Sequence, residues 1–118
     1  MNKNNYLNQA LKWVNKKQTT NLRAKLEGYE DPKVFRSKSN NEEFQADFSF
    51  ITPKGAKHFT DVALKNENPR KTVVKWKILS FMASMKKGKL HLLAPRGHKA
   101  FTERIVKRHN INAVIHSI

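Results

Sequence analysis

The chain has 118 residues, which suits one domain over residues 1–118 and is too short for two ordinary ones. It has no cysteine, which excludes disulfides, cysteine-ligated metal centres and a thiol nucleophile. Lysine and arginine number 24 against nine acidic residues, and the net charge of +15 favours a polyanionic partner, with nucleic acid ahead of an anionic membrane or an acidic protein. No apolar run is long enough to span a membrane and no secretory signal is visible, so the expected location is cytoplasmic.

The N-terminal part of the chain predicts a long helix and a short strand. Apolar residues recur at helical spacing from Tyr6 to Leu26, with a candidate break at Thr19 and Thr20, and a glycine follows as a helix stop. A short strand is expected at Val34 and Phe35, before a polar stretch that ends at Asn41.

Two well-defined strands follow, joined by a turn. Residues 44–50 alternate between apolar and polar, with aromatic enrichment, which is typical of a strand. Residues 52–55 have turn chemistry, and a second strand is expected from Lys57 to Lys65. Away from the aromatic face, the first strand presents Gln45, Asp47 and Ser49, and the second presents Asp61, Ala63 and Lys65.

The C-terminal half alternates helices and strands. Asn68 is a helix cap and Pro69 a first helical residue, and the helix is expected to run to Gly88. A buried strand at 90–94 precedes a second helix from Gly97 to Asn110 and a β-branched strand at 111–118. The inward face of the second helix is expected to carry Ala100, Phe101, Ile105 and Val106.

The predicted order of elements is α-β-β-β-α-β-α-β. Tight turns can join the first three strands, which are therefore expected to be antiparallel. Helical crossovers lead to the last two strands, which implies parallel neighbours and right-handed connections. The fold class is therefore α/β, with a mixed five-stranded sheet flanked by helices.

Asp47 and Asp61 are acidic residues that fall inside predicted strands. If the hairpin turns at residues 54–55, Asp47 lies opposite Asp61 or Ala63, with Cβ atoms about 5 Å apart, or about 7–8 Å for diagonal neighbours. Two carboxylates this close need a cation between them, and either a divalent metal or Lys65 can supply it. The alternative is a structural ion pair of Asp47 with Lys65 beside a solvated Asp61.

The placement of Asp47 on one strand, with Asp61 and Lys65 on the next, resembles the motif of the PD-(D/E)xK nuclease superfamily, which has the restriction-endonuclease-like fold. The core of that family has the same element order, so the resemblance covers nearly the whole chain. Ala63 stands at the family's acidic position, and Asp61, two residues earlier on the same face, is the expected substitute. The resemblance implies a Mg²⁺- or Mn²⁺-dependent endonuclease whose metal is bound by Asp47 and Asp61. In it Lys65 would orient the attacking water, and Gln45 would be an auxiliary group.

Basic residues cluster in the C-terminal half, where we expect contacts with the phosphate backbone of DNA. The residues expected to make them are Arg70, Lys71, Lys75, Lys77, Arg96, His98 and Lys99. The five histidines lack the spacing of a helical metal site and are interpreted as structural or phosphate-contacting.

Three functions from different classes fit these patterns. The first is a metal-dependent nuclease, which could act as a homodimer because cutting two strands often needs two sites. The second is a nucleic-acid-binding module of the same fold that lacks catalytic activity. The third is an interaction subunit whose basic faces meet an acidic partner.

Overall fold

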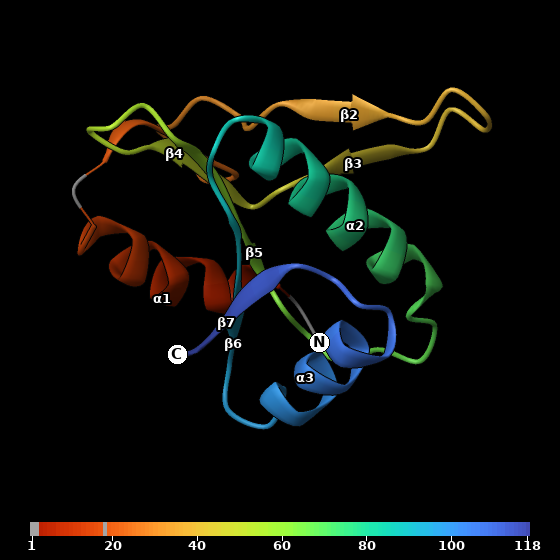
Figure 1. Ribbon diagram of the computed structural model, residues 1–118. Helices are drawn as coiled ribbons and strands as arrows, with labels where there is room; N and C mark the ends of the chain where they lie inside the picture. The colour runs from red at the N-terminus through yellow and green to blue at the C-terminus, as the bar shows by residue number, and fades with distance from the viewer. Residues whose placement is uncertain (1–2, 18) are drawn as a thin grey trace.

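The computed structural model describes residues 3–17 and 19–118, in which the chain forms three helices and seven strands (Figure 1). In chain order these are α1 Asn4–Asn15, β1 Thr20–Ala24, β2 Val34–Arg36, β3 Glu43–Gln45, β4 Phe48–Ile51, β5 Lys57–Val62, α2 Arg70–Met85, β6 Leu90–Ala94, α3 Lys99–Arg108 and β7 Ala113–Ser117.

A mixed five-stranded sheet organises the fold, as predicted. Its strand order is β1-β4-β5-β6-β7. The pairs β1–β4 and β4–β5 are antiparallel, and the pairs β5–β6 and β6–β7 are parallel. Helix α1 packs on one face of this sheet, and α2 and α3 pack on the other (Figure 1). Strands β2 and β3 form a separate antiparallel hairpin.

The predicted long helix from Tyr6 to Leu26 is wrong beyond residue 15. Helix α1 ends at Asn15, and β1 forms the first strand of the main sheet. Leu22 and Leu26 nevertheless pack against the same apolar cluster as α1, because that cluster lies on the face of the sheet that α1 covers. Leu22 and Leu26 continue the apolar spacing of α1 in the sequence, but they reach the shared cluster from β1 and from the segment that follows it.

The predicted strand over residues 44–50 is two strands with a break at Ala46 and Asp47. Glu43–Gln45 pairs with β2, whereas Phe48–Ile51 pairs with β5. The alternation is lost at this break, since Ala46 faces the α2 side while Phe48 packs with the α1 cluster. The element order is therefore α-β-β-β-β-β-α-β-α-β rather than the predicted α-β-β-β-α-β-α-β. The strand expected at Val34 and Phe35 belongs to the separate β2–β3 hairpin, and β1, which was not predicted, is the first strand of the main sheet.

The register of β4 and β5 brings the two strand carboxylates together. Phe48 pairs with Thr60, and one further step along the ladder sets Asp47 opposite Asp61. The backbone N–H of Asp47 still donates to the carbonyl of Thr60 at 3.1 Å. Strand β5 ends at Val62 rather than at Lys65, so Lys65 lies beyond the sheet and is exposed.

The helix boundaries differ from the predicted ones in detail. Pro69, and not Asn68, occupies the N-cap position of α2. In α3 the expected inward residue Ala100 is exposed, and Thr102 is buried in its place with its hydroxyl donating to the carbonyl of His98 at 2.8 Å. None of the helices in the described residues combines the length and apolar character that crossing a bilayer requires.

Candidate functional site

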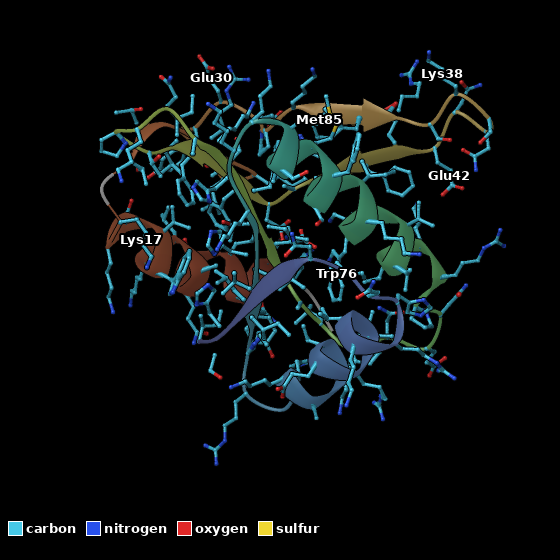
Figure 2. All side chains as sticks on the ribbon, in the orientation of Figure 1. Lys17, Glu30, Lys38, Glu42, Trp76 and Met85 are labelled. Atoms are coloured by element: carbon cyan, nitrogen blue, oxygen red, sulfur yellow. The ribbon has the colours of Figure 1, made fainter. Side chains whose placement is uncertain are left out.

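Asp47 and Asp61 are almost completely buried, with exposed fractions of 1% and 2%. The carboxylate of Asp47 accepts a hydrogen bond from the backbone N–H of Val62 through Oδ2 at 2.9 Å. The carboxylate of Asp61 accepts one from the indole N–H of Trp76 through Oδ2, also at 2.9 Å. Figure 2 labels Trp76, whose ring extends from α2 into the centre of the molecule. The two acids are therefore fixed by the end of β5 and by α2.

Two lysine amines complete this arrangement, which we call the carboxylate centre and define as Lys3, Asp47, Asp61 and Lys75. The Lys3 Nζ atom lies 2.9 Å from Asp47 Oδ2 and 3.2 Å from Asp61 Oδ1. The Lys75 Nζ atom lies 3.0 Å from Asp61 Oδ1. Asp47 Oδ1 is buried and has no hydrogen-bond partner within residues 3–17 and 19–118. One acceptor of the centre is thus left open.

The surroundings push the pKa values of the two carboxyl groups in opposite directions. Burial, followed by the charge of Asp61, raises the pKa of Asp47 to about 6. Burial acts in the same sense on Asp61, but the amines of Lys3 and Lys75 outweigh it and lower the pKa of Asp61. Burial disfavours the charged amine of Lys3, yet the charges of Asp61 and Asp47 prevail and raise the pKa of Lys3. The two amines therefore favour the ionised form of Asp61, whereas burial disfavours that of Asp47.

The predicted site residues Lys65 and Gln45 lie outside the carboxylate centre. Lys65 is exposed, and the described residues contain no ion pair between its amine and Asp47 or Asp61. The backbone N–H of Lys65 instead donates to His98 Nδ1 at 2.9 Å. The side chain of Gln45 donates to the carbonyl of Pro32 at 2.8 Å. The expected Asp47–Lys65 ion pair is wrong because β5 ends before Lys65.

Sequence reasoning missed Lys3 entirely and assigned Lys75 to phosphate contact only. Lys3 precedes α1, and Lys75 lies in the second turn of α2, so neither is near Asp61 in the sequence. The one available signal for Lys75 is its position one residue before the core residue Trp76. One helical step from Trp76 leaves Lys75 partly buried beside the inner face of α2 rather than on its fully exposed side.

Two adjoining hollows open beside the carboxylate centre. One encloses about 600 Å³ with Asp61 in its wall, and the other encloses about 460 Å³. Both are lined by Asn66, Thr72 and Lys75, so they form a continuous depression. We call it the basic groove, after the lysines that line it: Lys3, Lys25, Lys65, Lys71 and Lys75.

The residues predicted to contact nucleic acid are divided by the structure. Lys71 and Lys75 line the basic groove, and Arg70 lines a further hollow next to Lys71. The remaining cations of the predicted set lie on other exposed surfaces: Lys77, Arg96 and Lys99. His98 is 1% exposed and uses its Nδ1 atom as an acceptor for Lys65, so the prediction that it contacts phosphate is wrong.

Three histidines form a row across β5, β6 and β7 on the face that α1 covers. His58 Nδ1 lies 3.1 Å from His91 Nε2, and His91 Nδ1 lies 3.0 Å from His116 Nε2. The backbone N–H of Lys89 donates to His58 Nδ1 at 3.1 Å, so this nitrogen is an acceptor. With neutral rings, the protons of the two contacts then belong to the Nε2 atoms of His91 and His116.

Burial lowers the pKa of each histidine in this row. For His91 the neighbouring His58 and His116 act in the same direction as burial, and the pKa falls to about 4. Trp13 of α1 contacts the rings of both His91 and His116, with ring centroids 5.6 Å and 4.6 Å away. The row is therefore a neutral, packed element at physiological pH.

Among residues 3–17 and 19–118 no group of three or more histidine, cysteine or acidic side chains is placed to hold a metal ion. The carboxylate centre offers two. Comparison of the chain with protein-family models, with curated proteins and with solved structures gives no match in any of the three.

Proposed function

We propose that this protein acts on nucleic acid as a metal-dependent phosphodiester hydrolase with a restriction-endonuclease-like fold. The observation that carries the proposal is the buried pair of Asp47, directly before β4, and Asp61 in β5, which share the amine of Lys3 beside a groove lined by lysines. A buried acidic pair is costly and has little value in a surface that only attracts phosphate. It has a purpose if it holds a cation that itself contacts the phosphate.

The donor set suits Mg²⁺ or Mn²⁺. Magnesium keeps several waters and takes one or two protein carboxylates together with substrate phosphate oxygens, so a third protein ligand is not required. Asp47 Oδ1, buried and without a partner in the described chain, is an open acceptor of the right kind. Asp47 and Asp61 would hold the ion, which when bound lowers the pKa of a coordinated water and polarises the phosphoryl group.

The lysine placed to serve this chemistry is Lys75 rather than Lys65. Its amine lies 3.0 Å from Asp61 Oδ1, and its side chain lines both halves of the basic groove. An ammonium group at this position can orient a water or stabilise charge that develops on the phosphate. Lys65 also lines this hollow, and in this proposal it would contact the nucleic-acid backbone.

The second candidate is a nucleic-acid-binding module without catalysis. Its support is the pair of amines on the carboxylates, because Lys3 and Lys75 already balance the two negative charges. Ala63 occupies the position at which the PD-(D/E)xK nuclease superfamily, which the sequence resembles, has an acidic residue. In this alternative the ion pairs fix the end of β5, and the remaining net charge of the surface binds phosphate.

The test is cleavage of supercoiled plasmid and of branched duplex DNA by purified protein in Mg²⁺ or Mn²⁺ at low salt. The wild type is expected to cleave, and Asp47→Asn is expected to abolish cleavage while leaving the fold intact by circular dichroism. Glu67→Gln is the matched control, since it removes a carboxylate from the wall of the same hollow without touching the pair.

Equal cleavage by wild type and Asp47→Asn would refute a role for the carboxylate centre. A wild type that cleaves neither DNA in either metal, yet binds both with strong salt dependence, would establish the second candidate instead.

A further inference from the structure

Helix α2 is apolar on two opposite faces. Its inner face packs into the core through Val73, Trp76, Leu79 and Ala83. On the other side Val74, Phe81 and Met85 are 39%, 63% and 61% exposed, and Ile78 lies between them, partly buried. A surface helix of a soluble protein normally carries polar residues on that side, so an apolar outer face marks a contact surface.

The outer residues have the spacing of a helix–helix contact. Positions 74, 78, 81 and 85 follow each other at intervals of four, three and four residues, the pattern with which one helix packs along another. We call these four residues the α2 stripe. Eleven steps along the helix give it a length of about 16 Å, or about three turns of a docked helix.

The charged residues that helix α2 itself places along the α2 stripe are basic. Helix α2 contains no acidic residue. Helical spacing places the exposed Arg70 and Lys71 at the start of the stripe and Lys77 beside it, and the exposed Lys86 follows its end. A hollow of about 570 Å³ continues the stripe toward the β2–β3 hairpin, lined by Arg70, Lys71 and Val74 and, on the hairpin side, by Glu42.

We propose that the α2 stripe is a docking surface for an amphipathic helix of a partner protein, with apolar residues in its contact face and acidic residues on either side. The apolar part needs hydrocarbon side chains, which the phosphate backbone of nucleic acid does not offer. The basic border needs carboxylates. A second copy of this chain would place the same cations against each other if its α2 met this α2, which like-charge repulsion disfavours.

The probe is a labelled synthetic helical peptide with leucines at intervals of four, three and four and with glutamates flanking them. Fluorescence anisotropy is expected to show saturable binding to the wild-type protein. A peptide of identical composition with its leucines scrambled is expected to bind at least tenfold more weakly. The double variant Phe81→Ser/Met85→Ser removes the two most exposed members of the stripe and is expected to weaken binding at least tenfold.

Two controls make the result specific. Tyr29→Ser removes an exposed aromatic away from α2 and should leave binding unchanged. Lys77→Glu reverses one charge of the border, leaves the apolar residues in place and should weaken binding. Circular dichroism checks that each variant folds. We expect all of them to fold, because the substituted side chains are exposed.

Equal binding of the two peptides, or equal binding by the wild type and the Phe81→Ser/Met85→Ser variant, would overturn the proposal. So would a wild type that sediments as a dimer and a double variant that sediments as a monomer, since the occupant would then be a second copy. DNA cleavage is not read in this experiment, so its outcome is independent of the proposed hydrolase activity.

Discussion

Asp61 and Asp47 share the amine of Lys3, but they are supported unequally. Within residues 3–17 and 19–118 the carboxylate of Asp61 has three side-chain donors, from Lys3, Lys75 and Trp76. That of Asp47 has Lys3 and one backbone N–H on Oδ2, whereas its Oδ1 atom has no partner in the described residues. The two acids of one centre should therefore respond differently when their charge is removed.

Neutralising Asp61 should cost far more stability than neutralising Asp47. Asp61→Asn removes the counter-charge of the partly buried Lys75 amine and of Lys3, and we expect the free energy of unfolding to fall by about 3 kcal/mol. Asp47→Asn also relieves the burial cost that raises the pKa of this group to about 6, so we expect a change of at most about 1 kcal/mol. Urea denaturation at pH 7 measures both. An equal loss in the two variants would contradict the asymmetry.

The histidine row should make the protein sensitive to mild acid. The pKa values of His58, His91 and His116 lie below the usual 6.5, and that of His91 is about 4. Between these limits the unfolded chain binds protons that the folded chain does not, so the free energy of unfolding falls as the pH drops from about 6.5 toward 4. The positive charges of Lys17 and Lys89, which face the row, also lower the pKa of His91.

His91→Gln isolates this effect, because the raised pKa of Asp47 works in the opposite direction over the same range. A folded Asp47 takes up its proton near pH 6, earlier than in the unfolded chain, and so adds stability as the pH falls. That contribution is common to wild type and variant. We therefore expect the Tm difference between pH 7 and pH 4.5 to be smaller in His91→Gln, as measured by calorimetry. Parallel pH profiles would exclude a titrating row.

Removing a lysine of the basic groove should change the salt dependence of DNA binding. Each phosphate contact contributes about 0.9 to the slope of log K against log salt on duplex DNA. Lys71→Gln should therefore lower that slope by about one, measured by anisotropy from 50 to 200 mM salt. Lys54→Gln, in the turn between β4 and β5, removes an exposed lysine outside the groove and should leave the slope unchanged. If Lys71→Gln and Lys54→Gln had the same slope, the DNA would not bind in the basic groove.

Gly88→Ala should destabilise the protein, because a Cβ atom at this position would overlap the backbone carbonyl of Lys57. The neighbouring backbone is held by the hydrogen bond from the N–H of Lys57 to the carbonyl of Lys86 at 3.2 Å, so it cannot retreat freely. We expect a loss of about 2 kcal/mol, the cost of overpacking a tight contact. Lys86→Ala, two residues earlier, should change the unfolding midpoint little by comparison.

The sequence predicts the centre of the sheet well and its first strand poorly. Alternation over residues 44–50 and 57–65, with a turn between them, predicted Asp47 opposite Asp61 or Ala63, and the register of β4 and β5 sets it opposite Asp61. Strand β1 was hidden because Leu22 continues the apolar spacing of α1 across a change of element. Local periodicity identifies which residues face the core, but it does not say which element carries them there.

Contacts between distant residues were not predictable from the sequence. Lys3 and Asp61 are 58 residues apart, and their contact depends on where the start of α1 meets the end of β5. The histidine row depends on the registers of two parallel pairs, β5–β6 and β6–β7, which helical crossovers set. His58 and His91 are 33 residues apart, and His91 and His116 are 25 apart, so no local spacing marks them as neighbours.

The two tryptophans lie at the two ionisable clusters of this fold. Trp76 donates to Asp61, and Trp13 contacts His91 and His116. Each indole is therefore an intrinsic optical probe, one for the acidic side chains and one for the imidazoles. With Trp13→Phe or Trp76→Phe, the emission of the remaining indole would follow a single cluster without any added label.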